Sequence, residues 1–489
     1  MTTKNLQKGQ VLVQVIVFST IAVFVIGALL GWAGVNIKAS RQSVEREKAI
    51  QLAEAGIDYY RWHLAHASTD YQDGTGIPGP YVHDALDKEG NVAGQYSLSI
   101  TPPIVGSTKV IIESTGLPAN SNVQRKLRVE MAIPSLAKYA VVANDNMRFG
   151  EGTEVFGPIH SNYGIRFDGL AHNSVTSALG SYDDPDHSGA VEFGVHTHVN
   201  IPPSSGTNSS FRPLEAPPNT LATRSDVFET GRQLSVPAED FVGMTNDLAQ
   251  IKADAQAAGR YFAPSGYQGY QIILKTDDTF DLYRVTSQSS PPSYCTNYAG
   301  QTGWGTWSIG NKTFLANYSI PANGLIFVED NVWVEGSVNS TRVTIASGRF
   351  PDNPSNRPNV VVNNDLLYTN YDGTDVVALI SQGHVHVGMV SDTDLRIDAA
   401  LVAQNGRVGR FYYRPPGGGQ NRCSPYHSRS SITLYGMIAT AIRYGFAYTD
   451  GNGYTTRNII YDANLLYGPP PSFPLTSDQY EILSWEEVR

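Results

Sequence analysis

The stretch GQVLVQVIVFSTIAVFVIGALLGWAGVN, residues 9–36, decides how the chain is organised. It contains no charged residue, and residues 11–35 have no polar side chains other than those of Gln14, Ser19 and Thr20. A helix needs about 20 mainly apolar residues to cross the hydrocarbon core of a bilayer. We therefore predict a transmembrane helix over residues 10–36.

The charges on either side of this stretch predict its orientation. Lys4 and Lys8 precede it and no acidic residue does, which favours a cytoplasmic N-terminus. A cleaved secretory signal would have a shorter apolar core and a small-residue cleavage site, whereas here the chain continues into Lys38, Arg41 and Glu45. The sequence predicts a single-pass membrane protein with an extracytoplasmic body.

The helical pattern continues beyond the membrane segment. Residues 37–66, IKASRQSVEREKAIQLAEAGIDYYRWHLAH, contain no proline and one glycine, so we expect a single helix over residues 10–67. Residues at three- and four-residue steps form one face of it: Ala49, Ala53, Gly56, Tyr60 and Leu64. The small side chains on this face leave a groove in which a sheet can pack.

These features together resemble the type IV pilins and pseudopilins, and most closely the minor pilins of the PilX type. The resemblance rests on the basic leader ending in Gly9, the uncharged run after it, and LAEAG at residues 52–56. It implies that a prepilin peptidase removes residues 1–9, that the mature chain begins at Gln10, and that the helix packs against other pilin subunits in a filament. The alternative is an uncleaved signal anchor that never enters a filament.

Two positions depart from the family pattern. The family usually has Phe at the first mature position and Glu at the fifth, and this chain has Gln10 and Gln14 there. In the family the glutamate pairs with the terminal amine of a neighbouring subunit, and Gln14 carries no charge with which to do so. The resemblance therefore implies a minor, tip-proximal subunit, located at the cell surface or in a pilus after processing.

The composition indicates the fold class of the part of the chain outside the membrane. Charged residues make up 16% of the 489 residues, and Gly (46), Pro (28) and Tyr (27) are prominent, which favours a β-rich, loop-rich body. The net charge is −10, with no long basic run, so we expect no nucleic-acid partner. No cofactor motif is present, and we expect no cofactor.

Strand-like runs divide the exterior into parts. Residues 68–136 hold three alternating runs that predict a small antiparallel sheet, a pilin-like head covering the second half of the helix. Residues 137–170 read as the first strands of a β-solenoid, and residues 171–323 as an insertion containing a helix at 238–259. Residues 324–489 contain short apolar runs punctuated by Asn and Gly, which favour a parallel β-helix over a sandwich or a propeller.

The chain has two cysteines, Cys295 and Cys423, without the CxxC spacing of a zinc site. Both lie in loop-like surroundings, and an extracytoplasmic location permits oxidation. We expect a disulfide between them; two unpaired buried thiols are the alternative.

Three groups of residues suggest chemistry. The pairs His384/His386 and His196/His198 each fall on one face of a strand, but alternating valines explain this pattern and no carboxylate lies at ligand spacing, so we expect no metal site. The third group is an acidic one, formed by Asp392, Asp394 and Asp398. It is typical of polysaccharide-cleaving enzymes or of an Asp-rich turn, and we favour the turn. We expect no catalytic residues and no enzyme.

One loop is rich in aromatic and arginine residues. Tyr412, Tyr413, Arg414 and Tyr426 form a candidate contact surface for a surface glycan or a protein, because Tyr and Arg are common at binding hot spots. A packing loop held by Cys423 is the alternative. The sequence thus predicts a minor pilus or pseudopilus subunit that displays a large domain for adhesion or filament assembly. A surface-anchored polysaccharide-acting β-helix enzyme and a structural envelope spacer are the other candidates.

Overall fold

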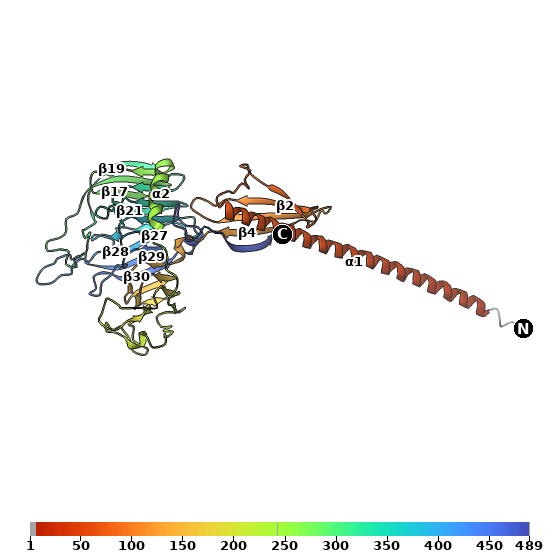
Figure 1. Cartoon of the computed structure of the whole chain (residues 1–489), viewed down its shortest axis with the longest axis horizontal. Coiled ribbons are helices and arrows are strands. Elements are labelled where there is room, and N and C mark those ends of the chain that lie inside the picture. The colour runs from red at the N-terminus through yellow and green to blue at the C-terminus, as the bar shows by residue number, and fades with distance from the viewer. Residues whose placement is uncertain (1–5, 242, 489) are drawn as a thin grey trace. The chain divides into compact units, whose positions relative to one another are not determined.

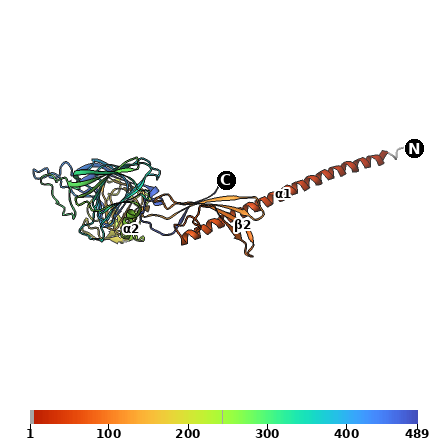
Figure 2. The same ribbon diagram turned by 90° about the horizontal axis from the view of Figure 1, so that it is seen from above.

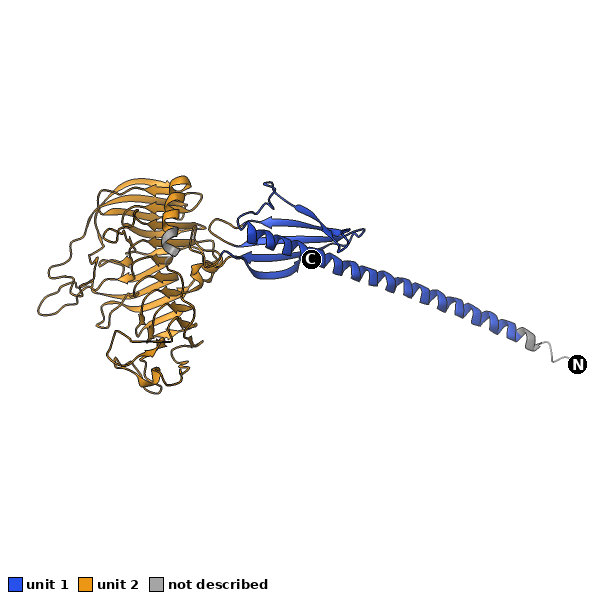
Figure 3. Ribbon diagram, viewed as in Figure 1, with its two compact units in different colours: residues 1–102, 109–132, 478–489 blue, residues 103–108, 133–477 orange. Residues whose placement is uncertain are grey.

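The computed structural model describes residues 6–241 and 243–488 of the chain. The chain is mainly β, with one long N-terminal helix, and it forms two compact units (Figure 3). The first unit consists of residues 1–102, 109–132 and 478–489, and the second of residues 103–108 and 133–477. Residues 1–5 of the expected leader lie outside the described residues.

The first unit is built on α1 (Leu6–His66), a single helix of 61 residues (Figure 1). Its large apolar side chains from Val11 to Ile37 are all exposed. By length and composition this part of α1 can cross a membrane, and it fits a single-pass anchor. A row of exposed apolar side chains this long is not stable in water, so a bilayer or partner helices must cover it.

The second half of α1 packs on a five-stranded antiparallel sheet in the order β1, β2, β3, β4, β31. The bounds are β1 (Tyr81–Leu86), β2 (Val92–Thr101), β3 (Val110–Pro118), β4 (Arg125–Ala132) and β31 (Glu481–Val488). Ala53, Ile57 and Tyr60 are buried in the core between helix and sheet. Strand β31 comes from the C-terminal end of the chain, a stretch that we expected in the body.

Glycines let the helix approach the sheet closely. A Cβ at Gly56 would lie 2.8 Å from the ring of Tyr96 on β2. On β3, a Cβ at Gly116 would overlap the carbonyl oxygen of Ala49 and lie 2.6 Å from the backbone nitrogen of Ala53. The groove that the small side chains of the helix predicted is therefore confirmed, and the sheet contributes a glycine of its own to it.

The second unit contains a sheet of 21 strands. One continuous series of parallel pairs runs β16, β20, β22, β25, β27, β29, β5, β8, β11, β15. The bounds are β16 (Arg260–Phe262), β20 (Leu325–Val328), β22 (Arg342–Ser347), β25 (Val376–Ser381), β27 (Asp394–Ala403), β29 (Ser428–Thr440), β5 (Val141–Ala143), β8 (Ile159–Ser161), β11 (Val175–Ser177) and β15 (Arg232–Gln233).

Other parallel series run beside the first. They are β17–β21–β23–β26–β28, β29–β30–β7–β10, and a separate three-stranded sheet β6–β9–β14, while β24 pairs with β21 and β27. The bounds are β17 (Gly269–Leu274), β21 (Val332–Val338), β23 (Val360–Val361), β24 (Leu366–Tyr368), β26 (Val385–Val387), β28 (Val408–Arg410), β30 (Gly453–Tyr461), β7 (Thr153–Phe156), β10 (Leu170–Ala171), β6 (Met147–Phe149), β9 (Ile165–Phe167) and β14 (Val195–His196).

The remaining elements are hairpins, short helices and one longer helix. Strands β18 (Thr279–Gln288) and β19 (Ile309–Ser319) continue antiparallel from β17, and β12 (Ser181–Tyr182) pairs antiparallel with β13 (Glu192–Phe193). The short helices are η1 (Leu136–Lys138), η2 (Pro213–Glu215) and η3 (Ala463–Leu466). The longer helix is α2 (Gly243–Ala258), within residues where we expected a helix over 238–259.

Both faces of the parallel series are buried because side chains alternate between two cores. On β20, Ile326 and Val328 belong to one core, and Leu325 and Phe327 belong to the other. The second core also contains Leu248, Ile251 and Ala255 of α2, so α2 covers this face of the sheet.

The order of strands in the sheet does not follow the order of the chain. Strands β5, β8 and β11 come early in the sequence, yet they continue the series beyond the late strand β29 (Figure 1). Residues 171–323, which we expected to be an insertion, contribute β11 and β15–β19 to the same sheet. Strands of two or three residues, such as β15, carry too little periodic pattern to be recognised from the sequence.

Candidate functional site

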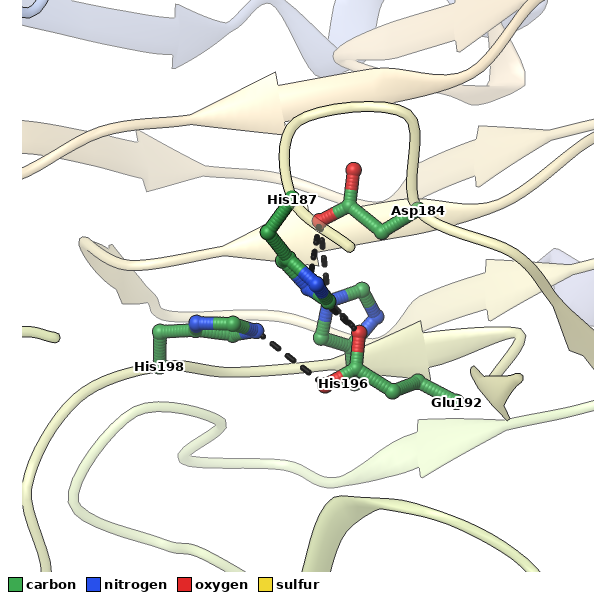
Figure 4. Close-up of side chains that lie close together, drawn as sticks. All are labelled: Asp184, His187, Glu192, His196 and His198. Carbon is green, nitrogen blue, oxygen red and sulfur yellow. Dashed lines mark hydrogen bonds and ion pairs between the residues drawn. The ribbon is translucent and has the colours of Figure 1, made fainter. Parts of the chain in front are cut away.

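Five acidic and histidine side chains converge in the second unit (Figure 4). This group, here called the 184–198 cluster, consists of Asp184, His187, Glu192, His196 and His198. Each residue offers one ligand atom, and these atoms all lie within 4.8 Å of one another. None of the five side chains is more than 5% exposed.

Local structure places each member of the cluster. Asp184 and His187 lie in the loop of the β12–β13 hairpin, and Glu192 lies on β13 opposite Tyr182. His196 lies on β14, whose parallel partner is β9. His198 follows two residues later, and its backbone N–H donates to Asp168 Oδ1 at 2.8 Å.

The two carboxylates lie among the imidazole nitrogens. Glu192 Oε2 is 3.0 Å from His187 Nε2 and 3.2 Å from His196 Nε2, and Glu192 Oε1 is 3.2 Å from His198 Nε2. Asp184 Oδ2 is 3.4 Å from His196 Nε2 and 3.6 Å from His187 Nε2. Every imidazole thus presents its Nε2 atom to a carboxylate oxygen.

Several of these buried polar atoms lack a hydrogen bond. Neither ring nitrogen of His196 makes one, and neither does Asp184 Oδ2. His198 Nδ1 lies 2.9 Å from the carbonyl oxygen of Asn208. Because a carbonyl oxygen only accepts, Nδ1 of His198 carries a hydrogen.

The surroundings keep both carboxylates ionised. Burial disfavours the charged form of Asp184, but the His196 ring, the backbone N–H of Asp186 and the Arg166 guanidinium outweigh it, and its pKa lies well below the usual value. Burial opposes ionisation of Glu192 too, yet the nearby His198 and His196 rings lower its pKa. The cluster therefore holds two buried negative charges.

This geometry corrects the sequence-based interpretation of His196 and His198. The expectation that neither histidine pair belongs to a metal site assumed that no carboxylate lies at ligand spacing, and for this pair the assumption is wrong because Glu192 and Asp184 lie beside it. Asp184, His187 and Glu192 were not singled out. The sequence feature that could have indicated the cluster is the close spacing of its members, since all five ligand side chains fall between residues 184 and 198.

Comparisons with known proteins do not assign the chain to a family. No protein-family model and no curated protein matches the chain. Among solved structures it is similar to the crystal structure of the competence-associated pilin ComZ from Thermus thermophilus, with 12% identity over 91% of this chain and 97% of that one and a TM-score of 0.31. A TM-score this low carries no weight for fold or function.

The second histidine pair has a different environment. His386 is buried and packs edge-on against Trp307 and Phe411, and His384 Nδ1 accepts a hydrogen bond from the Arg407 backbone N–H at 2.9 Å. Among the described residues, no acidic side chain joins this pair in a ligand cluster. Burial, followed by the Arg407 guanidinium, lowers the pKa of His384 to about 4.

We expect His384 to make the folded chain acid-sensitive. Because its pKa is lower in the folded chain than in the unfolded chain, the unfolded chain binds the proton first, and stability falls as the pH drops below about 6.5. Between about pH 7 and about pH 5 the contribution of His384 to this loss is about 2 kcal/mol. His384→Asn keeps an acceptor for the Arg407 N–H and should remove most of that loss in denaturant titrations at the two pH values. His66→Asn, which changes an exposed histidine, is the control, and equal acid sensitivity of the wild type and His384→Asn would contradict the prediction.

The two cysteines form a disulfide, with their sulfur atoms 2.07 Å apart. Cys295 and Cys423 are buried in a small core that includes Met389, Phe411 and Tyr413. Trp304, Trp307 and Tyr426 pack partly buried against this core.

One of the four residues of the expected contact surface, Tyr413, is buried, and the other three are partly exposed, so that the surface stays a prediction for Tyr412, Arg414 and Tyr426. Tyr413 is 0% exposed, and its hydroxyl donates to the Gly305 carbonyl oxygen at 2.9 Å. Tyr412, Arg414 and Tyr426 are half-buried. The Tyr412 hydroxyl donates to Asp450, and the Arg414 guanidinium lies 4.2 Å from the centre of the Tyr298 ring. Tyr413 and Tyr426 thus pack around the disulfide.

The acidic group does not share one environment. Asp398 is fully buried and accepts hydrogen bonds from Arg396 Nε, the Tyr371 hydroxyl and the Tyr368 backbone N–H. Asp394 is exposed and accepts from the Ser431 hydroxyl at 2.6 Å. Asp392 is half-buried, and burial raises its pKa. The hydrogen-bond partners of Asp398 are thus side chains and a backbone N–H of its own and neighbouring segments.

The expected processing positions lie at the start of α1. Gly9 is within the helix, and Gln10 and Gln14 are exposed on it. No described side chain covers Gln14, so its amide is available to a neighbouring molecule.

Proposed function

We propose that the chain is a minor, tip-proximal subunit of a type IV pilus or pseudopilus, of the PilX-like kind. In this role α1 first anchors the chain in the membrane and then packs among other pilin subunits. The observation that carries the proposal is the division of one continuous helix into two halves. The first half is apolar and exposed, and the second is docked on an antiparallel sheet.

The exposed half of α1 has features suited to packing against other helices. Gly27 and Gly31 are four residues apart, and apart from their chain neighbours and the adjoining backbone of α1 no described atom lies within 4 Å of where a Cβ would stand on either. Small residues at this spacing let two helices approach closely in a bilayer. The same surface thus serves as a membrane anchor and as an assembly surface.

Gln14 supports the minor role. A subunit that lacks a carboxylate at this position cannot pair it with the terminal amine of a neighbour, and an unpaired ammonium in the bilayer is costly. Such a subunit fits best at the tip of the filament, where it does not have to make this pairing with a neighbouring subunit.

The body is proposed to be a parallel β-helix displayed outside the cell for adhesion or filament assembly. Successive parallel pairs that continue over many short strands, each with a core on its inner face, support this architecture. We propose a binding or structural body with no enzymatic activity, since Asp398 is fully engaged in structural hydrogen bonds. A surface-anchored polysaccharide-cleaving enzyme would need a second carboxylate facing its scissile bond.

The test of the filament role is processing at Gly9. In cells that carry a prepilin peptidase, we expect the mature chain to begin at Gln10, as measured by mass spectrometry of the intact protein. Gly9→Leu should leave residues 1–9 attached, because the peptidase needs a small residue before the cut, and should abolish recovery of the chain in sheared filaments.

The matched control is Gly27→Leu, which changes a glycine within the apolar run and should leave the cleavage intact. An N-terminus at Met1 or Thr2 in the wild type would reject the filament proposal and favour an uncleaved envelope anchor. If the wild type and Gly9→Leu have the same mass, residue 9 has been removed from both chains. Cleavage would then not need the glycine, which would reject processing by a prepilin peptidase.

A further inference from the structure

We propose that the 184–198 cluster binds one divalent transition-metal cation, with Zn²⁺ as its representative. The site is buried in the second unit, and its ligands are three imidazole nitrogens and two carboxylates. The inference does not depend on the filament role, because it concerns only the chemistry of these side chains.

The distances within the cluster match those of a metal's ligand shell. Zn²⁺ binds nitrogen and oxygen ligands at about 2.0–2.1 Å, so neighbouring ligand atoms in a tetrahedron lie about 3.3 Å apart. His187 Nε2, His196 Nε2, Asp184 Oδ2 and Glu192 Oε2 show four such separations: 3.0, 3.2, 3.4 and 3.6 Å. His198 Nε2 is a fifth donor beside these four, 3.2 Å from the other oxygen of Glu192.

The hydrogen positions also point to a cation. His198 Nδ1 carries a hydrogen because it faces the Asn208 carbonyl oxygen, so in the neutral ring Nε2 has a lone pair directed at Glu192. Outer-sphere hydrogen bonds of this kind fix the tautomer of metal-binding histidines. These two lone pairs repel unless a proton or a metal cation lies between them, and a bound cation would accept both at once.

His196 gives an independent indication. It is 0% exposed, both its ring nitrogens lack hydrogen bonds, and its Nε2 points to Asp184 and Glu192 (Figure 4). A buried polar group without a partner costs about 1–3 kcal/mol. Coordination of a metal ion by Nε2 removes part of this cost.

The charges nearby leave room for a dication. Arg166 lies 3.9 Å from Asp184 Oδ2, but its Nε is already paired with Asp168 at 2.7 Å. At this distance Arg166 makes no hydrogen bond to Asp184 Oδ2, and that oxygen is left facing the imidazole rings of the cluster. A divalent cation bound among the rings would be coordinated by the Asp184 and Glu192 carboxylates together.

The donor set selects the class of metal. Imidazole and carboxylate ligands without thiolate suit Zn²⁺ and neighbouring first-row ions, whereas Ca²⁺ and Mg²⁺ are bound through oxygen ligands. All five donors are buried, which is typical of a closed structural site. Bound there, the ion links the loop of the β12–β13 hairpin to β14.

The experiment measures metal in the untagged full-length chain, purified in detergent. We expect one Zn²⁺ per chain by elemental analysis after gel filtration, retained in the presence of excess Ca²⁺ and Mg²⁺. Removal with a strong chelator should lower the melting temperature, and added Zn²⁺ should restore it. These measurements need no variant, so they stand even if a substituted chain fails to fold.

A pair of variants assigns the site. His196→Gln should weaken Zn²⁺ binding by at least about 100-fold. Loss of an outer-sphere partner alone weakens metal binding by up to about 100-fold, and this variant removes a direct ligand. His172→Gln is the matched control, because His172 also lies beside two carboxylates, Glu154 and Glu229, but at a more open position. It should bind Zn²⁺ as the wild type does.

Each contrary outcome overturns the proposal. A chain that holds no Zn²⁺ and melts at the same temperature with and without chelator contains only a cluster of histidine–carboxylate ion pairs. Tighter binding of Ca²⁺ than of Zn²⁺ rejects the metal class. An equal loss of binding in His172→Gln and His196→Gln places the ion elsewhere.

Discussion

Replacing both cysteines, Cys295→Ser with Cys423→Ser, is expected to lower the free energy of unfolding of the second unit by about 4–5 kcal/mol. The disulfide closes a loop of 128 positions, and a crosslink over a long loop removes much of the conformational freedom of the unfolded chain. Denaturant titration of the full chain in detergent measures the change.

The double variant supplies its own control. A reducing agent should destabilise the wild type by a similar amount and leave the double variant unaffected. If the variant unfolds at the same denaturant concentration as the oxidised wild type, the packing of Met389, Phe411 and Tyr413 holds these loops without the crosslink.

The variant Gly116→Val is expected to destabilise the docking of α1 on its sheet by about 3 kcal/mol or more, at the upper end of what overpacking costs. A side chain at this position meets backbone atoms of Ala49 and Ala53, which cannot turn away as a side chain can. The helix must shift or separate from the sheet. Protease cleavage between residues 37 and 66 should become faster, and hydrogen exchange of the same segment should increase.

Thr115→Val is the control on the neighbouring position of β3. Successive residues of a strand point to opposite faces, so the added methyl group at residue 115 does not face the helix. Equal protease resistance of the wild type, Thr115→Val and Gly116→Val would show that the sheet and the helix do not approach as closely as the structure describes.

The mainly β architecture with one long N-terminal helix could be predicted because its signals are local. Charge-free apolar residues over 9–36 and helical spacing up to His66 determine the helix without reference to anything distant. The pairing of β31 with β4 had no such signal. Strand β31 is mostly exposed and carries several charges, and backbone hydrogen bonds and an ion pair between Arg125 and Glu487 join it to β4, which no local side-chain pattern records.

The candidate site was harder to predict than the fold. The His196/His198 pair was visible in the sequence, but reading it as an alternating strand hid Glu192, which reaches the same point through the β12–β13 hairpin. Tyr413 shows the opposite error. Its residue type suggested an exposed contact, and only the three-dimensional packing around the disulfide shows that it is buried.

The order of strands in the parallel series sets a condition on the synthesis of the protein. Strands β5 and β7 leave the ribosome early, but their partners β29 and β30 are among the last parts of the chain to emerge. The first unit has the same dependence, because β31 at residues 481–488 completes its sheet. Neither unit is complete until nearly the whole chain has been made, so a message truncated before β29 yields two unfinished units.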